Sequence, residues 1–204
     1  VWSRPEEDGA EIEFLRPLHG PHRLRGVTRP LRGHGHVGSI LLEGLDLLST
    51  YTRGLAIPVR LGEEVDRLRI RVPTLGGYVV NKATVYPLRR RDDAGDNPKG
   101  AKDLLYLRDI AAAGADVTAS VRQDVLGIVG DGRGASLRVS TARNNLQMTT
   151  RGSLRAEAVA DAAAMLSERE GVERVAARAD LVGYLNDLHE LLDEALKGAA
   201  KRRR

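Results

Sequence analysis

Hydrophobic and polar residues alternate in two short stretches of the first half of the chain, and each predicts a β-strand. Residues 11–15 read Glu-Ile-Glu-Phe-Leu and residues 68–72 read Leu-Arg-Ile-Arg-Val. In a strand every second side chain points to the same side, so this alternation puts residues of one kind on one face. Leu68, Ile70 and Val72 are therefore expected to face a core, with the arginines outward. Two further short strands are expected at residues 24–31 and 54–60.

Glycine and leucine patterns predict the elements between these strands. Residues 33–38, Gly-His-Gly-His-Val-Gly, predict a turn. Residues 40–50 are rich in leucine and predict a short helix. Thr74 follows a proline and is expected to cap the N-terminus of a helix that runs to about Tyr86.

Beyond a charged loop at residues 89–98 the pattern becomes helical. Helices are expected at 99–113, 115–129, 133–147, 152–169 and 172–198. The last of them has a leucine stripe at the spacing of a buried helix face, formed by Leu181, Leu185, Leu188, Leu192 and Leu196. The basic tail 201–204 is expected to be solvated and disordered. The predicted fold class is α+β, with a mixed α/β domain at 1–98 and a helical domain at 99–204.

Composition narrows the classes of protein. The chain has 204 residues, a net charge of +4 and no cysteine, so disulfides and thiolate metal sites are excluded and a cytoplasmic location is expected. No apolar run approaches the ~18 residues of a membrane span, and no membrane partner is expected. The basic excess permits a nucleic-acid partner without showing one.

Paired carboxylates in the first predicted strand suggest a metal site. Glu11 and Glu13 lie two residues apart and so share one face. Oxygen ligands of this kind suit Mg²⁺. The alternative is an acidic, solvent-facing side of a strand that binds nothing.

Lys82 is a candidate anion ligand. It is one of few lysines in the chain, and Tyr78 and Tyr86 lie one turn before and after it on the same helix face. The ammonium either extends along this apolar stripe to water or meets an anion such as a nucleotide phosphate.

Asp103 is a candidate acidic residue in the first turn of the following helix, where it would complement the macrodipole. It shares a face with Leu107 and Ile110 and is expected to point inward, so it needs a cationic or metal partner. Four nearby cations could provide this partner: Lys82, Arg89, Arg90 and Arg91.

The order and spacing of these segments resemble a nucleotidyltransferase family, the group related to the AbiEii-type and mycobacterial nucleotidyltransferase toxins of the DNA polymerase β-like superfamily. The resemblance covers roughly residues 11–113. It starts at Glu13-Phe14-Leu15-Arg16-Pro17-Leu18-His19-Gly20 and ends at Lys102-Asp103-Leu104. It implies that the first domain is the remainder of a nucleotidyltransferase-like mixed sheet with helices, followed by a helical bundle.

The resemblance also implies residue roles. Glu13, Lys82 and Asp103 correspond to catalytic positions, with Glu11 and Glu13 as Mg²⁺ ligands. Nucleotide-binding roles are expected for Lys82, Arg89, Arg90 and Lys102. The implied activity transfers a nucleotide from a nucleoside triphosphate to a hydroxyl of RNA or protein, as the toxin of a toxin–antitoxin pair, with an antitoxin protein as partner.

One family element has no match. The Gly-Ser turn followed by an Asp-x-Asp strand would precede Glu13 and is expected upstream of Val1. Gly38-Ser39 is followed by Asp46-Leu47-Leu48, which has a single acidic residue and no Asp-x-Asp pair, and it is rejected as that motif. The His34-x-His36 pair lacks a third ligand and is not assigned to a metal. The alternative function is therefore a non-catalytic or degenerate binding module with the same fold.

Overall fold

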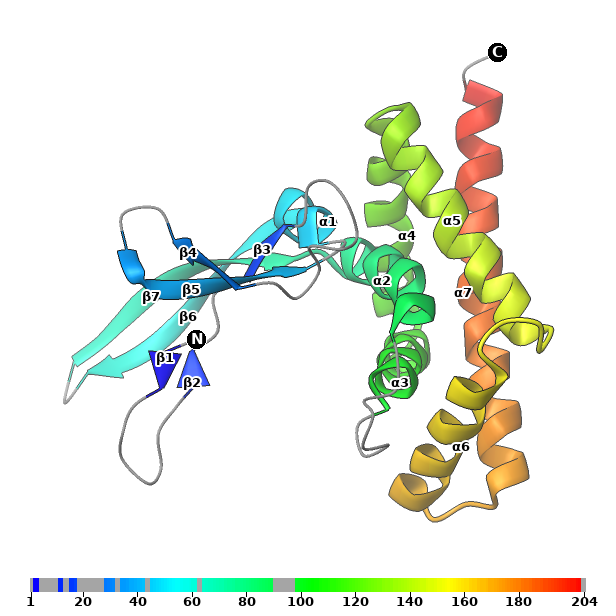
Figure 1. Cartoon of the computed structure of the whole chain (residues 1–204). Helices are drawn as coiled ribbons and strands as arrows, with labels where there is room; N and C mark the ends of the chain where they lie inside the picture. Colours follow the sequence, from blue (N-terminus) through cyan, green and yellow to red (C-terminus); the bar gives the residue numbers. More distant parts are fainter. Residues whose placement is uncertain are drawn as a thin grey trace.

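The structure, a computed structural model, describes residues 2–3, 11–12, 15–17, 28–31, 34–42, 45–61, 64–89 and 98–202. Strands occupy the first part of the chain and helices the second, so the fold class is α+β, as expected (Figure 1).

The described strands form three separate sheets. In the first, β1 (Trp2–Ser3) pairs antiparallel with β2 (Glu11–Ile12). In the second, the order is β3-β5-β4, and β5 pairs parallel with β3 and antiparallel with β4. The third is an antiparallel hairpin of β6 and β7. The bounds of these later strands are Leu15–Pro17 for β3, Thr28–Leu31 for β4, His34–Leu42 for β5, Thr52–Leu61 for β6 and Glu64–Pro73 for β7.

The expected turn is wrong for residues 34–38, and the expected start of a helix at residue 40 is wrong too. Residues 34–38 and 40–42 belong to β5, and the helix α1 begins later, at Leu45–Thr50. Because β5 has a neighbour on each side, its backbone groups gain partners on both edges. These non-local hydrogen bonds outweigh the turn preference of the glycines.

The strands expected at residues 54–60 and 68–72 are present in β6 and β7, but the expected burial of Leu68 is not. In the register, Ile57 lies opposite Leu68 and Leu55 lies opposite Ile70. Leu55, Ile57 and Leu68 are 45%, 37% and 54% exposed, so the expectation that Leu68 faces a core is wrong. Within the described residues the hairpin is a two-stranded ribbon whose apolar face is partly exposed.

The helical region matches the expected elements closely. Thr74 caps α2 (Leu75–Val85) as expected, because its Oγ1 accepts a hydrogen bond of 3.1 Å from the Gly77 amide. A short 3₁₀ turn, η2, follows at Tyr86–Leu88. The remaining helices are α3 (Lys99–Ala112), α4 (Ala115–Gly130), α5 (Arg133–Thr150), α6 (Ala156–Glu170) and α7 (Arg174–Arg202).

A single hydrophobic core joins α2 with α3 to α7. The stripe of α7 is buried as expected at Leu181, Leu185, Leu188 and Leu192, and it packs in the same cluster as Val79, Val80 and Ala83 of α2. The C-terminal end of α7 differs from the expectation. Residues 201–202 were expected to be disordered, but they continue the helix and are exposed.

Candidate functional site at the junction of α2 and α3

Lys82 and Asp103 meet between α2 and α3. Lys82 lies in the last turn of α2, and its Nζ donates a hydrogen bond of 2.5 Å to Oδ1 of Asp103. The Asp103 side chain is only 5% exposed and that of Lys82 is 15% exposed. The cationic partner that the inward-facing carboxylate was expected to need is therefore present.

Arg89 provides a second cation on the same carboxylate. Its Nε donates to Oδ2 of Asp103 at 3.2 Å. Arg155, at the start of α6, holds this segment in place by donating to the carbonyl oxygens of Pro87 and Arg89. The cluster of Lys82, Arg89 and Asp103 thus has an excess of one positive charge.

The expected first-turn position of Asp103 is wrong. The α3 helix begins at Lys99 and has no acidic residue in its first turn, so Asp103 lies in the second turn and is buried. Its charge is therefore balanced by side chains instead of by the helix N-terminus, whose field fades within one turn.

Two tyrosines flank the Lys82 ammonium. The ring centroids of Tyr78 and Tyr106 each lie 5.3 Å from Nζ, a cation–π distance. The two rings pack edge to face, with centroids 6.5 Å apart. Tyr106 was not singled out from the sequence, although its position three residues after Asp103 on the same helix could have signalled it.

Tyr86 does not share this environment, contrary to the expected stripe. Its hydroxyl points into the bundle, where it pairs with the Thr149 side chain and with the carbonyl oxygen of Asn145. Tyr86 is only 1% exposed. The Tyr86 amide still donates to the Lys82 carbonyl oxygen, and the 3₁₀ turn starts at Tyr86 itself.

Burial changes the ionisation of Tyr78. Desolvation, followed by the negative charge of Asp103 and the neighbouring Tyr106, raises the pKa of Tyr78 to about 12. The phenol therefore stays protonated at neutral pH and remains a hydrogen-bond donor beside Lys82.

The other expected site residues are not placed together with this cluster. The side chain of Glu11 lies outside the described part, as do Glu13 and Arg90. Lys102 is on the exposed side of α3. It lines an open groove of about 390 Å³ between α3 and α6, together with Leu105, Tyr106, Asp109, Met165, Glu168 and Arg169. Tyr106 is common to this groove and to the surroundings of Lys82.

The described residues bring no cluster of metal-ligating side chains to Lys82 and Asp103. No group of three or more His, Asp or Glu side chains comes together within the described ranges. Both oxygens of Asp103 already accept hydrogen bonds from the cations Lys82 and Arg89. These positive charges would repel a divalent metal ion. Magnesium binding by Glu11 and Glu13 therefore stays a prediction.

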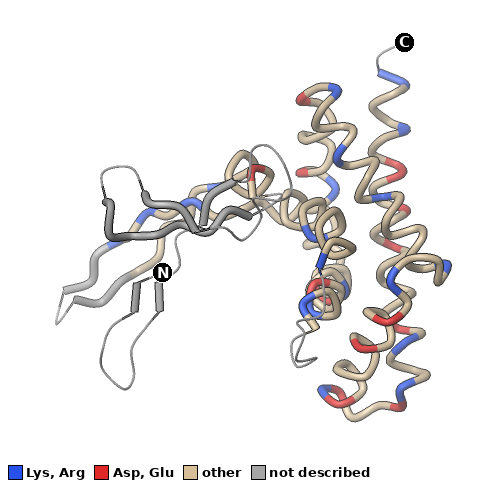
Figure 2. The backbone as a smooth tube through the Cα atoms, in the orientation of Figure 1, with Lys and Arg blue, Asp and Glu red and all other residues tan. Residues whose placement is uncertain are grey.

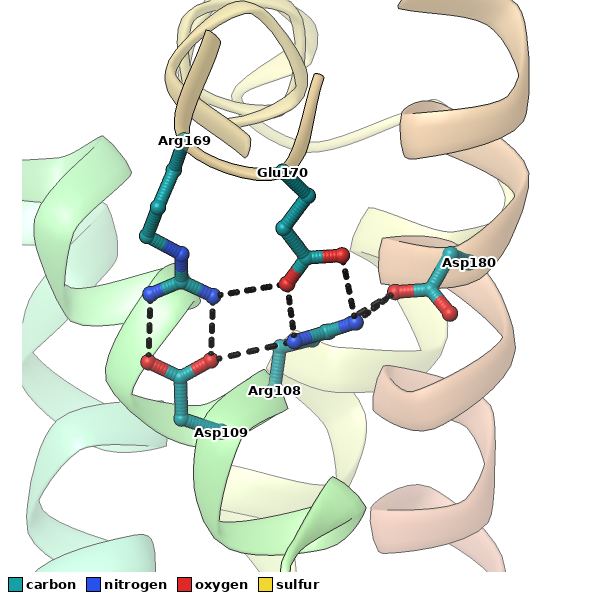
Figure 3. A network of polar contacts seen from close by, with 5 residues as sticks. All are labelled: Arg108, Asp109, Arg169, Glu170 and Asp180. Atoms are coloured by element: carbon teal, nitrogen blue, oxygen red, sulfur yellow. Dashed lines mark hydrogen bonds and ion pairs between the residues drawn. The ribbon is translucent and has the colours of Figure 1, made fainter. Parts of the chain in front are cut away.

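A network of charged side chains holds α3, α6 and α7 beside this groove (Figure 3). Arg108 donates to Glu170 at 2.8 Å and to Asp180 at 2.7 Å. Arg169 donates to both oxygens of Asp109, at 2.8 and 2.7 Å. The hydrogen bonds from Arg169 lower the pKa of Asp109, although burial opposes this shift. The network fixes the helices that position Tyr106 and Lys102.

Comparison with protein-family models, curated proteins and solved structures finds no match to this chain. Among the described helices, none combines the length and apolar character needed to cross a membrane. The geometry around Lys82 and Asp103 is therefore the main support for a function.

Proposed function

We propose that the protein is a nucleotidyltransferase that moves a nucleotide from a nucleoside triphosphate to a hydroxyl of an RNA or protein acceptor. One observation supports this most directly. Lys82 and Asp103, which the family resemblance assigns to the site, come from separate helices and contact each other at 2.5 Å. The roles of toxin and antitoxin partner belong to the same proposal and derive from the resemblance alone.

The chemistry of Lys82 is compatible with phosphate binding. An ammonium has three donors, and one of them contacts Asp103. In the proposed complex Asp103 positions the ammonium, and the remaining donors bind phosphate oxygens of the triphosphate. Arg89 contacts Asp103 through Nε, so its terminal guanidinium nitrogens would contribute a bidentate phosphate contact.

Transfer from labelled nucleoside triphosphates tests this proposal. We expect wild-type protein to incorporate label into an RNA pool or into protein. Lys82→Met and Asp103→Asn should each reduce the transfer rate at least about a hundredfold. The first removes the ammonium that stabilises the phosphate charge, and the second removes the carboxylate that positions this ammonium. Lys197→Met is the matched control, because Lys197 pairs with Asp193 on the exposed side of α7. Wild-type rates in both site variants would overturn the proposal.

A second candidate is a non-catalytic binding module of the same fold. The observation in its favour is that both oxygens of Asp103 are already paired, as in an ion cluster that only joins two helices. This candidate predicts no incorporation by the wild-type protein with any triphosphate. It also predicts that Lys82→Met changes the free energy of unfolding without any effect on nucleotide affinity, which calorimetry measures.

A further inference from the structure

The β6–β7 ribbon has one strongly basic face. In the hairpin register, Arg67 lies opposite Pro58, Arg69 opposite Ala56 and Arg71 opposite Gly54. Residues on opposite positions of an antiparallel pair project to the same side. Each arginine therefore faces a residue that has no long side chain, and the row is accessible along its length.

The three arginines form a regular row on a single strand. All are exposed, and Arg71 donates from Nε to Oγ1 of Thr52 at 3.0 Å, which orders one end of the row. Every second residue of a strand repeats at about 7 Å. This repeat is comparable with the distance between neighbouring phosphates along an extended nucleic-acid strand.

The arginine row lies on the face opposite to most of the apolar side chains. Leu55, Ile57 and Leu68 belong to that opposite face, where Arg53 is paired with Val72. Between Thr52 and Pro58 and along their partners on β7, the basic face has no acidic position. Basic residues recur along this ribbon, away from the mixed charges of the helices (Figure 2). A polyanion would meet a row of three exposed arginines here.

We propose that the arginine row of Arg67, Arg69 and Arg71 binds the phosphate backbone of single-stranded RNA. A row on one strand matches one backbone, which favours a single strand over a duplex. The choice of RNA rests on the proposed function, whose acceptor this surface would hold. No aromatic residue interleaves the arginines on β7, so stacking on bases is not provided. Binding is therefore independent of base sequence.

Fluorescence anisotropy with a labelled oligouridine of about twelve nucleotides tests the surface. We expect wild-type affinity to fall with salt with a slope near −2, because three phosphate contacts on a single strand give about −0.7 each. The triple variant R67Q/R69Q/R71Q should bind at least about tenfold more weakly at moderate salt and lose most of this slope.

Two matched control variants test whether RNA binding depends on this surface or only on the total positive charge of the protein. R133Q/R174Q/R178Q removes the same number of exposed arginines from the helices and should keep wild-type affinity and slope. R67K/R69K/R71K keeps the charge of the row and should keep the slope. An equal loss in the helical variant, unchanged affinity in R67Q/R69Q/R71Q, or no RNA binding by the wild type would overturn the proposal.

Other ligands and the catalytic proposal give distinguishable outcomes. Tighter arginine-dependent binding to duplex DNA, to vesicles of anionic lipid or to an oligoglutamate peptide would overturn the assignment to RNA. Lys82→Met should bind the oligouridine as the wild type does. Arginine-dependent RNA binding without any nucleotide transfer would overturn the proposed function and support this surface. If R67Q/R69Q/R71Q leaves nucleotide transfer to RNA unchanged, that result would support the proposed function and overturn this surface.

Discussion

The Nζ atom of Lys82 lies 2.5 Å from Oδ1 of Asp103, across 21 positions of sequence. The contact joins the end of α2 to the second turn of α3, with Arg89 on the other carboxylate oxygen. Both side chains are largely removed from water, so the charge of Lys82 is compensated by Asp103, and that of Asp103 by Lys82 and Arg89. The pair is therefore important for stability whichever function the site has.

Breaking this pair from one side should be costly. Asp103→Ala leaves the Lys82 ammonium beside apolar neighbours without its carboxylate, and we expect a loss of about 3 kcal/mol in the free energy of unfolding. The double variant Lys82→Met/Asp103→Leu removes both charges and should lose clearly less. Urea unfolding measures both values. Equal losses in the single and double variants would show that the charges are not coupled.

Close packing of α2 on α4 should make Gly76 intolerant of any side chain. A Cβ at this position would lie 2.4 Å from Cβ of Asp124 and 2.9 Å from the backbone nitrogen of Val125. The Gly76 amide also donates to the Asp124 carboxylate at 3.0 Å. We expect Gly76→Ala to destabilise the protein by about 2 kcal/mol, through overpacking and a displaced hydrogen bond.

Gly127→Ala is the control for that prediction. Gly127 lies in α4, and a Cβ there meets no atom within 4 Å. The substitution should stabilise the protein by about 0.5–1 kcal/mol, because alanine favours helix. Thermal unfolding of both variants gives the comparison, and a stable Gly76→Ala protein would contradict the close approach of the two helices.

Stability should fall at alkaline pH in part because of Tyr78. Its pKa is raised from 10.0 to about 12 in the folded protein. Below pH 10 the phenol is protonated in both the folded and the unfolded protein, so its contribution to the free energy of unfolding is fully present. Between about pH 10 and 12 only the unfolded chain ionises, and stability decreases as the pH rises.

Tyr78→Phe isolates this effect. The chain has 5 tyrosines, so the difference in phenolate absorbance between wild type and variant reports on Tyr78 alone. We expect this difference to titrate about two pH units above an ordinary tyrosine, and the variant to lose less stability over the same range. A difference titration near pH 10 would contradict the burial of Tyr78 beside Asp103.

The charged network between α3, α6 and α7 should contribute more than an exposed ion pair. Arg108 contacts carboxylates of Asp109, Glu170 and Asp180, and its side chain is 13% exposed. Arg108→Met should cost about 2 kcal/mol, because a partly buried network loses its central cation.

Arg122→Met provides the comparison within the same bundle. Arg122 pairs with Glu194, and their side chains are 48% and 59% exposed. Removing it should change stability by less than about 0.5 kcal/mol. Denaturant unfolding at low and high salt measures both losses, and similar values for the two variants would show that the network adds nothing beyond a surface pair.

The helices could be predicted from the sequence because their signals are local. Periodic leucines, flanking glycines and the cap at Thr74 each act within a few residues, and all the expected helices from residue 74 onward are present. The inward orientation of Asp103 was also predictable, since it followed from the shared face with Leu107, which is fully buried.

The tertiary structure decided which elements and side chains meet. Only packing places Tyr106 beside Lys82, joins α2 to the core of α3 to α7, and leaves Leu68 exposed on the hairpin. A hydrophobic pattern identifies a face that can be buried, but it does not identify what covers that face, because burial depends on the positions of residues distant in the chain. For the same reason, the sequence indicated that Asp103 needs a cation, and the fold selected Lys82 and Arg89.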